Sequence, residues 1–424
     1  ILLSDKKIKV LTMGDHPLLP SGVGTQSRYV FEALLDTGKF EILSLGGAIK
    51  HPSYEPQRTE KYQDSWTIMP VNGYGDAQTL RGHVLSFKPD IIWFMTDPRF
   101  YEWLWGMEDE LRENCSLVYY HVWDNYPYPT FNKTYYNSND AIATISKVTS
   151  DIVKTVAPDV HEKYIPHAVD PNVFNNEKDQ QQEKTIREIK EAHNLDKKFV
   201  FFWNNRNARR KQSGSLVFWW KEFLDIVGHD KATLIMHTEP YDPHGQPIPT
   251  LMDNLGLTQE QLFISVQKVP PEHMALFYKM SDCTVNISDA EGFGLATLES
   301  LACGTPIIVN MTGGLQEQVT DGEEYFGIGI EPSSKAVIGS NQCPWICEDR
   351  ISKQDFLDAC LKMYNMSQEE RDVLGEKGRQ HVLKNYNFET FQKQWVDFMT
   401  GIYENNGSWE KRKFDNNRWE LIEV

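Results

Sequence analysis

The 424-residue chain exceeds the size at which one hydrophobic core keeps growing, so two domains are expected. Its composition, 40% hydrophobic and 12% aromatic, suits packed cores, yet no stretch approaches the roughly 20 uninterrupted apolar residues of a membrane-spanning helix. A net charge of −17 disfavours bulk nucleic acid and anionic membrane surfaces as partners.

The six cysteines are sparse and lie mostly in apolar runs, which favours a reducing compartment without a disulfide framework. The first ten residues are charged too early for a secretory signal, so we expect a cytoplasmic protein. Cys343 and Cys347 lie close together in CPWIC, but no second Cys or His pair is nearby, and we expect no zinc site.

Short β-like runs alternate with helical stretches along the first half of the chain. This alternation is typical of a parallel sheet covered on both faces, so an α/β domain is predicted. The expected strands are IKVLTM (8–13), FEILSL (40–45), DIIWFM (90–95), SLVYYHV (116–122) and AIATIS (141–146).

Two features of this half are candidates for ligand contact. SGVGT (21–25) is a glycine-rich turn before a helix, where backbone amides can approach an anion or a sugar, although a plain tight turn explains it equally well. It lacks the full G-x-G-x-x-G fingerprint, so no nicotinamide site is expected. His121 and Asp124 lie at the carboxyl end of the fourth strand, and a histidine satisfied by a backbone carbonyl is the ordinary alternative to a ligand contact.

The charged, amide-rich stretch DPNVFNNEKDQQQEK (170–184) interrupts the strand pattern. We therefore expect a first domain over residues 1–172, a second over 173–390, and a C-terminal helix and tail over 391–424 that pack toward the first domain. Two doubly wound domains would place a ligand cleft at the carboxyl ends of their strands. The expected strands of the second domain are KFVFFWN (198–204), ATLIMHT (232–238), LFISV (262–266), TVNIS (284–288) and TPIIVN (305–310).

A basic loop follows the first strand of the second domain, in FFWNNRNARRKQSGSL (201–216). Arg206 and Lys211 there carry the charges that suit a pyrophosphate through charge-assisted hydrogen bonds. A solvated basic loop is an equally common arrangement.

Two glutamates mark the stretch SDAEGFGLATLESLACGTP (288–306). Glu291 precedes a glycine-rich strand-to-helix junction whose free amides can hold a phosphate, while its carboxylate can accept hydrogen bonds from a polyol. If a helix begins at Gly294, Glu299 falls within a face of leucine and small residues, with only Thr297 and Ser300 opposite. An ionised carboxylate there needs a hydrogen-bonding partner, either from the protein or from a ligand such as a ribose diol.

With these motifs the chain resembles the retaining glycosyltransferases of family 4, which have the GT-B fold of two Rossmann-like domains facing across a cleft. The resemblance covers nearly all of residues 8–400. It rests on the E-x7-E spacing from Glu291 to Glu299, the R-x4-K pair, the SGVG loop, ATISKVTSDIV, IPHAVDPNVF (165–174) and GGLQEQVTDGEEYFGI (313–328). Ala168 stands where the family often has glycine.

The resemblance implies that Arg206 and Lys211 neutralise the diphosphate leaving group and that Glu291 orients the hydroxyls of the donor sugar. Glu299 would bind the ribose, and the segment from Val266 to Val269 would flank the nucleobase. The donor site implied for the second domain also includes Gly292, Phe293, Gly294 and Leu295.

From the first domain, the resemblance implies that Gly22 and Gly24 approach the diphosphate and acceptor, and that His121 lies near the anomeric carbon. The catalytic set is then Glu291, Arg206, Lys211 and His121. Asp-x-Asp, the carboxylate pair that holds a divalent ion in the other major glycosyltransferase fold, is absent from the sequence. We therefore expect metal-independent transfer without a cofactor, from a UDP- or GDP-sugar donor.

The sequence does not identify the acceptor. A glycan is the default, and a hydroxymethylated DNA base of viral type is the alternative, for which ARRK (208–211) and KRK (411–413) could contact phosphates against the net charge of −17. A sugar-nucleotide epimerase, a phosphorylase and a non-catalytic nucleotide-sugar-binding protein are the other readings of the same fold. The sequence does not indicate an oligomeric state.

Overall fold

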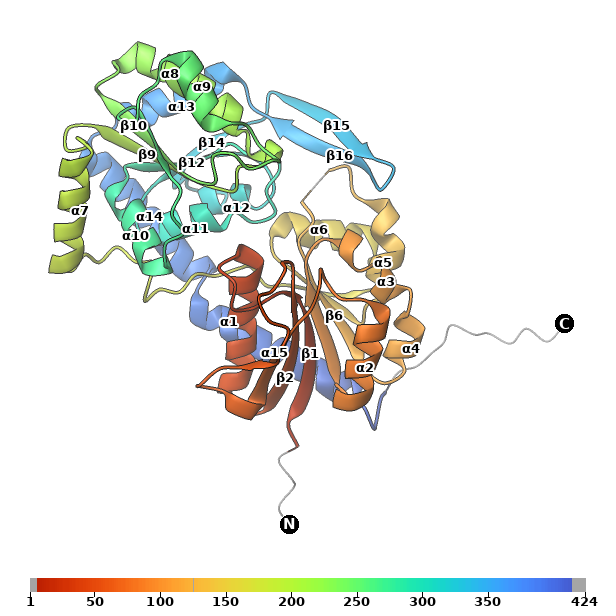
Figure 1. The fold of residues 1–424 in the computed structure, drawn as a ribbon. Helices are drawn as coiled ribbons and strands as arrows, with labels where there is room; N and C mark the ends of the chain where they lie inside the picture. Colours follow the sequence, from red (N-terminus) through yellow and green to blue (C-terminus); the bar gives the residue numbers. More distant parts are fainter. Residues whose placement is uncertain (1–5, 125, 414–424) are drawn as a thin grey trace. The chain divides into compact units, whose positions relative to one another are not determined.

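The computed structural model describes residues 6–124 and 126–413, which form two compact α/β units (Figure 1). The first unit contains the described residues up to 123, residues 128–166 and residues 389–413. The second contains residues 124, 126–127 and 167–388. The predicted α/β class with a parallel sheet in each of two domains is confirmed. Residues 414–424 of the expected C-terminal tail lie outside the described part of the chain.

The first unit is built on an eight-stranded sheet with the order β3-β4-β2-β1-β5-β6-β7-β8, in which only the β3–β4 pairing is antiparallel. Its five predicted strands are present, and three short ones were not predicted. The strands are β1 (Ile8–Asp15), β2 (Phe40–Gly47), β3 (Gln57–Arg58), β4 (Trp66–Pro70), β5 (Ile91–Met95), β6 (Ser116–His121), β7 (Ala141–Thr144) and β8 (His161–Tyr164).

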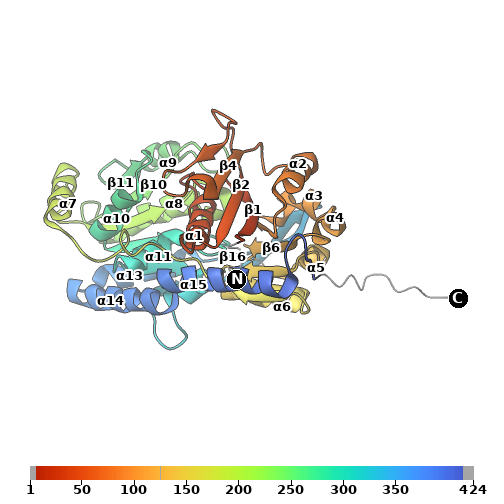
Figure 2. The same ribbon diagram turned by 90° about the horizontal axis from the view of Figure 1, so that it is seen from below.

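Helices cover both faces of this sheet (Figures 1 and 2). Trp93 on β5 contacts Phe31 of α1 and Trp395 of α15 on one face, whereas its neighbour Phe94 contacts Tyr101 on the other. This division follows from the alternation of side chains along a strand. The helical elements are α1 (Gly22–Asp36), η1 (Gln63–Ser65), α2 (Ala77–Phe87), η2 (Pro98–Phe100), α3 (Glu102–Trp105), α4 (Glu108–Arg112), η3 (Thr130–Asn132), α5 (Lys133–Asn137), α6 (Lys147–Val156) and α15 (Phe388–Asn406).

The second unit is built on a six-stranded parallel sheet with the order β11-β10-β9-β12-β13-β14. A two-stranded antiparallel hairpin, β15–β16, follows β14 as a separate ribbon (Figure 1). The strands are β9 (Phe199–Asn204), β10 (Ala232–His237), β11 (Leu262–Ser265), β12 (Cys283–Asn286), β13 (Ile307–Asn310), β14 (Gly327–Ile330), β15 (Ser334–Ser340) and β16 (Cys343–Arg350).

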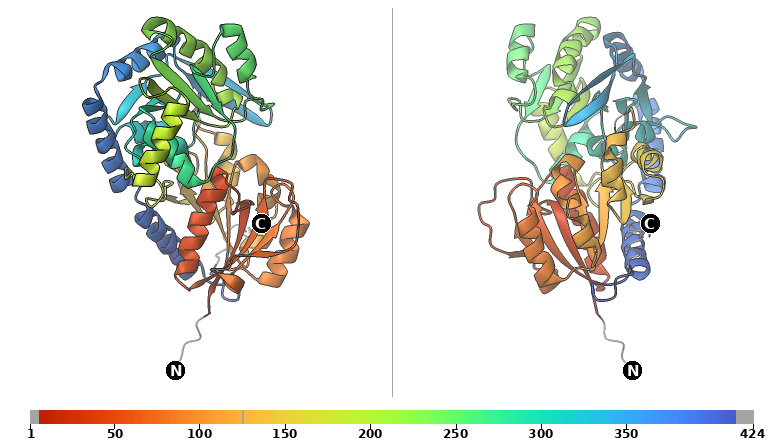
Figure 3. Two further views of the ribbon diagram at one scale, coloured as in Figure 1. Left: turned by 60° about the vertical axis from the view of Figure 1, so that its left-hand side comes forward. Right: turned by 90° about the vertical axis from the view of Figure 1, so that its right-hand side faces the viewer.

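Helices again lie on both faces of the sheet (Figure 3). Phe201 on β9 contacts Trp220 of α8, whereas Phe202 stacks on Phe277 of α10. The helical elements are α7 (Gln180–Ala192), η4 (Arg209–Lys211), α8 (Ser213–Val227), α9 (Ile248–Leu255), α10 (Pro271–Met280), α11 (Leu295–Ala302), α12 (Leu315–Val319), α13 (Lys353–Asn365) and α14 (Gln368–Asn385).

All six cysteines are buried free thiols. Cys343 and Cys347, which the sequence placed in a candidate metal motif, lie on strand β16. No helix among the described residues is long and apolar enough to cross a membrane.

The C-terminal helix α15 contributes to the core of the first unit through Trp395. This side chain is fully buried, and its ring centroid lies 6.0 Å from that of Trp93 and 4.8 Å from that of Tyr120. Trp395→Ala is expected to lower the free energy of unfolding by about 3–5 kcal/mol, because it removes a large buried ring and leaves a cavity. Urea denaturation followed by circular dichroism measures this change. Leu85→Ala, at an exposed position of α2, is the control and should shift it by less than about 0.5 kcal/mol.

Candidate active site

An ion pair between Lys211 and Glu291 lies at the carboxyl ends of two adjacent strands, β9 and β12. Lys211 ends the short helix η4, and Glu291 lies in the loop before α11. Both side chains are buried. Carboxyl ends of parallel strands meet at one edge of a sheet, which explains how two residues 80 positions apart in the chain come into contact.

Further polar groups surround the Glu291 carboxylate. It accepts hydrogen bonds from the Asn286 amide at 3.2 Å and the Ser288 hydroxyl at 3.3 Å, and the Arg210 guanidinium lies 3.7 Å away. Burial favours the neutral acid, but the charges of Lys211 and Arg210 outweigh it and lower the pKa of Glu291 to about 2. Glu291 is therefore ionised at neutral pH, as an acceptor of hydrogen bonds.

Arg206, which the sequence predicted to neutralise the diphosphate together with Lys211, contacts other side chains in the structure. Its Nε donates to Asp242 Oδ2 at 2.9 Å and its Nη2 lies 3.1 Å from His244 Nδ1, with 63% of the side chain exposed. The structure instead brings Arg210 to the site, where Nη1 donates to the carbonyl oxygen of Ala290 at 2.5 Å. The sequence signal for Arg210 was the basic run ARRK, which did not show which cation turns toward Glu291.

The junction between Glu291 and α11 is held in a fixed shape by neighbouring glycines. Gly294 caps α11 with φ +89°, and a Cβ there would lie 2.6 Å from Leu315 Cδ2. Gly313 has φ +48°, and its Cβ would overlap the carbonyl oxygen of Glu291. Gln318 donates from its amide to the carbonyl oxygens of Phe293 and Gly294 at 2.7 and 3.0 Å. The N–H groups that begin α11, including that of Leu295, have no intrahelical partner and form an electropositive helix end beside Gly292.

Glu299 lies about one turn beyond Leu295 on α11, is half-buried and has a protein partner. The Tyr278 hydroxyl donates to Glu299 Oε2 at 2.6 Å and accepts from the Asn204 amide at 3.0 Å. Burial raises the pKa of Glu299 to about 7, although the bond from Tyr278 acts in the opposite direction. The carboxylate therefore changes its charge near neutral pH.

The expected division of α11 into an apolar and a polar face is wrong. Thr297 and Ser300 are fully buried, because the helix is covered by α10 and α14 as well as by the sheet. Their hydroxyls are satisfied inside the unit: Thr297 donates to Gln318 Oε1 at 2.6 Å and Ser300 to Thr284 Oγ1 at 2.7 Å. The more accessible side of α11 is the one that carries Glu299, which helical periodicity had assigned to the apolar face.

Asp124 is a second carboxylate of this site. Asp124 belongs to the second unit. The Asp124 Cβ atom lies 3.5 Å from the position that a Cβ atom on Gly313 would occupy. Burial raises the pKa of Asp124 to about 6, with the charge of Arg210 opposing this shift and that of Glu291 adding to it. The site thus combines Lys211 and Arg210 with two carboxylates.

Val266 and Val269, the expected flanks of a nucleobase, lie in the loop between β11 and α10. Val266 is exposed and Val269 half-buried. Nearby, His237 Nδ1 lies 2.9 Å from the hydroxyl of Ser265, the last residue of β11.

The remaining predicted residues belong to the first unit. His121 ends β6 as a buried side chain with Nε2 2.5 Å from the Tyr136 hydroxyl, and burial lowers its pKa to about 3. Its Nδ1 has no hydrogen-bond partner within the described part of the protein. The structure therefore gives this histidine a hydroxyl partner, in place of the carbonyl that ordinary packing suggested.

Gly22 and Gly24 lie in the first turn of α1, whose N-cap Ser21 accepts a hydrogen bond from the Gly24 N–H at 2.9 Å. A Cβ on Gly24 would lie 2.9 Å from the carbonyl oxygens of His16 and Leu19. Close packing therefore explains glycine at position 24, whereas Gly22 is exposed.

Known proteins are similar to this chain in part of its sequence and in its fold. Residues 224–381, which include both glutamates, match the family model "Glycosyl transferases group 1". The D-inositol 3-phosphate glycosyltransferase of Acidothermus cellulolyticus is 37% identical over 114 residues, which are 27% of this chain and 23% of that protein. A GDP-mannose-dependent alpha-(1-6)-phosphatidylinositol monomannoside mannosyltransferase of Mycolicibacterium smegmatis is 26% identical over 193 residues, 44% of this chain and 48% of that one. The matches to the first curated relatives span less than a third of their lengths.

Solved structures extend the likeness to nearly the whole chain. Sucrose-phosphate synthase from Thermosynechococcus elongatus has a TM-score of 0.74 at 16% identity, covering 94% of this chain and 100% of that one. HepE from Anabaena, in complex with UDP and glucose, has a TM-score of 0.67 at 13% identity, covering 93% and 100%. At this sequence identity the solved structures establish the fold alone. The family model, which matches residues 224–381, includes Glu291 and Glu299. Over residues 224–381 the chain carries a group 1 glycosyltransferase domain, similar to glycosyltransferases of the family 4 type, and nearly the whole chain has the GT-B fold.

Proposed function

We propose that this protein transfers a sugar from a nucleotide-diphosphate sugar to a hydroxyl group of a glycan, with retention at the anomeric carbon and without a metal ion. The observation that carries the proposal is the buried ion pair of Lys211 and Glu291, with the exposed Arg210 guanidinium next to it, beside the start of α11. Two cations and a helix N-terminus at one sheet edge suit a diphosphate.

In the proposed reaction the bond between the anomeric carbon and the donor phosphate breaks, and negative charge develops on the departing diphosphate. Lys211 and Arg210 stabilise that charge where it forms, together with the amides at the start of α11. The diphosphate competes with Glu291 for Lys211, which leaves the Glu291 carboxylate to accept hydrogen bonds from the sugar hydroxyls. The acceptor oxygen forms the new bond to the anomeric carbon on the face that the diphosphate leaves, and the departing phosphate takes its proton, so the configuration is retained. Arg206 keeps its proposed role as a further cation for the diphosphate.

The rest of the donor is assigned to neighbouring elements of the second unit. Glu299, oriented by Tyr278, binds the ribose diol, and Val266 and Val269 flank the base. UDP and GDP donors are both proposed, because HepE was solved with UDP and the mycobacterial relative is named as GDP-mannose-dependent.

The acceptor side is assigned to the first unit, with His121, Gly22 and Gly24. Named relatives act on an inositol phosphate, a phosphatidylinositol mannoside and malate, so the acceptor varies among similar proteins. A glycan is the acceptor proposed for this chain.

Thermal stabilisation by a panel of UDP-, GDP- and ADP-sugars tests the donor proposal. One donor is expected to stabilise the protein by about 2.7 kcal/mol at a concentration a hundred times its Kd. Arg210→Met should lose most of this effect because it removes a cation from the diphosphate, whereas Lys393→Met, on the exposed face of α15, should not. No stabilisation by any donor would contradict the proposal.

Once the donor is identified, transfer should persist in the presence of EDTA, and NMR of the product should show the donor's anomeric configuration.

A further inference from the structure

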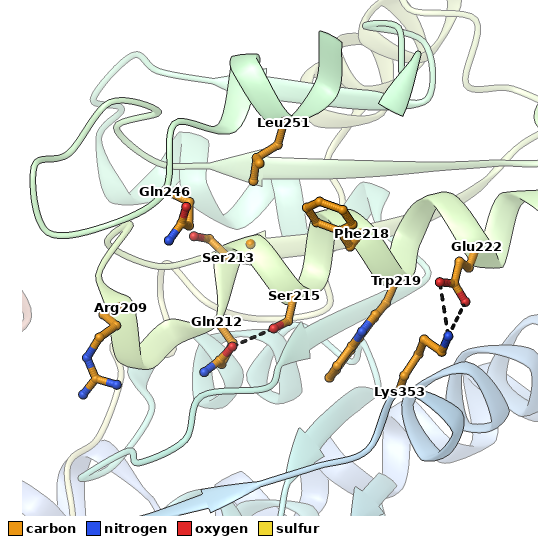
Figure 4. A pocket seen from close by; sticks show the side chains of 11 residues that line it. Arg209, Gln212, Ser213, Ser215, Phe218, Trp219, Glu222, Gln246, Leu251 and Lys353 are labelled. Carbon is orange, nitrogen blue, oxygen red and sulfur yellow. Dashed lines mark hydrogen bonds and ion pairs between the residues drawn. The ribbon is translucent and has the colours of Figure 1, made fainter. Parts of the chain in front are cut away.

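A cavity of about 520 Å³ lies along the N-terminal half of α8, in the second unit (Figure 4). This volume falls within the roughly 300–1,000 Å³ of pockets that bind small molecules. Its walls come from η4, α8, α9 with the loop before it, and the start of α13, and none of the residues assigned above to the donor lines it. The cavity is therefore a second candidate site.

Two aromatic side chains face this cavity. Phe218 is 48% exposed although it lies on a helix whose other side forms the core. Trp219 is half-buried and held in place by Phe356, with 5.5 Å between ring centroids. Aromatic faces carry negative charge density and are apolar, so they suit the C–H bonds on the face of a sugar ring. The apolar part of the wall can therefore hold a sugar ring.

Uncharged polar side chains complete the wall of the cavity. Ser215 donates to Gln212 Oε1 at 2.7 Å, and Gln212 Nε2 donates to Asp289 at 2.7 Å. Gln246 lies over the first turn of α8, since a Cβ on Gly214 would come within 3.0 Å of its Cγ. Amides and hydroxyls both donate and accept hydrogen bonds, as the hydroxyls of a sugar do. The lining therefore matches a ligand rich in hydroxyls.

The charged groups at the two ends of the cavity are already neutralised. In Figure 4, Arg209 lies at one end of the row of side chains and the Glu222–Lys353 pair at the other. Lys353 Nζ lies 3.0 Å from Glu222, and Arg209 pairs with Glu348. An anionic ligand would have to displace one of these carboxylates, whereas an uncharged one would not. The balance of charge favours a neutral ligand.

We propose that the cavity along α8 binds a neutral oligosaccharide at a site separate from the donor. This inference goes beyond the transfer reaction, because such binding requires no turnover. The bound sugar would lie on the face of Phe218 and Trp219, with its hydroxyls bonded to the side chains of Ser215 and Gln246. Gln212 connects this wall to Asp289, in the loop that carries Glu291.

Isothermal titration of the full chain with maltotriose, mannotriose and cellotriose tests this proposal. At least one trisaccharide should bind, and Phe218→Ala should weaken it at least tenfold. The matched control is Ile226→Ala, because Ile226 is 56% exposed on the same helix but outside the cavity, and it should leave binding unchanged. Circular dichroism verifies that both variants are folded, and neither should change the affinity for a nucleotide sugar.

The proposal is overturned if no trisaccharide binds, if binding is the same in Phe218→Ala, or if a nucleotide sugar competes with the trisaccharide. Binding of inorganic phosphate that is lost in Arg209→Met would also overturn it, by showing an anion site. The proposed function fails separately, when nucleotide sugars do not bind while the trisaccharide does.

Discussion

Replacing Lys211 with methionine is expected to slow sugar transfer by a factor of about 10²–10³. The same change should lower the free energy of unfolding by about 3–5 kcal/mol, because it removes one partner of a buried ion pair and leaves Glu291 without its closest cation. Both effects have one cause, since the ammonium group that neutralises Glu291 in the free protein is the group proposed to receive the diphosphate. Steady-state kinetics with the identified donor and urea denaturation measure the two effects.

Two further variants separate the role in catalysis from the role in stability. Lys211→Met combined with Glu291→Gln removes both charges, so it should recover much of the stability while transfer stays lost. Arg206→Met removes the exposed partner of an ion pair with Asp242 and should change stability by about 1 kcal/mol, so its activity tests the predicted role of Arg206 directly. Full activity in Lys211→Met would refute the assignment of the diphosphate to this cluster.

The affinity for the donor nucleotide is expected to increase by about tenfold between pH 6 and pH 8, through Glu299. Its pKa of about 7 means that the side chain is largely neutral at pH 6 and ionised at pH 8. The ionised carboxylate can accept hydrogen bonds from both hydroxyls of a ribose, and bonds to a charged group are worth about 1.5–3 kcal/mol. Titration calorimetry with the nucleoside diphosphate at a series of pH values measures the change.

Glu299→Gln should lose the part of the pH profile that comes from Glu299, because the amide does not titrate, and should keep the part that comes from Asp124 and from the diphosphate itself. Tyr278→Phe removes a hydrogen bond that lowers the pKa of Glu299, so the midpoint should move to higher pH. The stability of the free protein should decrease with rising pH, whereas the affinity for the nucleotide increases. The folded state holds the proton of Glu299 more tightly than the unfolded chain does. The stabilisation from Glu299 is therefore complete below about pH 4.5 and is lost as the pH rises to about 7. An equal pH profile in wild type and Glu299→Gln would exclude Glu299 as its source.

The sequence predicted the long central strands because they are continuous buried apolar runs. β5 and β9, for example, are buried along nearly their whole length. It did not predict β14, which reads GIGI, because alternating glycines carry no strand signal. In the structure these glycines are required: a Cβ on Gly327 would lie 2.0 Å from the carbonyl oxygen of Ile307 on the neighbouring strand. Close packing of the backbone is visible only after the strands have been paired.

The sequence singled out the two glutamates of the candidate site, but it identified only part of the basic cluster beside them. The spacing of Glu291 and Glu299 follows from a turn and a helix, which are local. The basic loop contains Arg206, Arg209 and Arg210, and each is directed by a carboxylate distant in sequence, namely Asp242, Glu348 and Glu291 respectively. Glu348 lies on the unpredicted hairpin β15–β16, so the sequence alone could not assign these partners.

The position of Trp395 in the chain has a consequence for synthesis on the ribosome. Trp93 and Tyr120 are translated early, but the helix that covers them follows only after the whole second unit has been made. At about 5–20 residues per second, the interval from Tyr120 to Trp395 lasts roughly 15–55 s. During that time the second unit can complete its own core, whereas the first exposes an uncovered aromatic face. Nascent chains of intermediate length should therefore be the ones that recruit holdase chaperones.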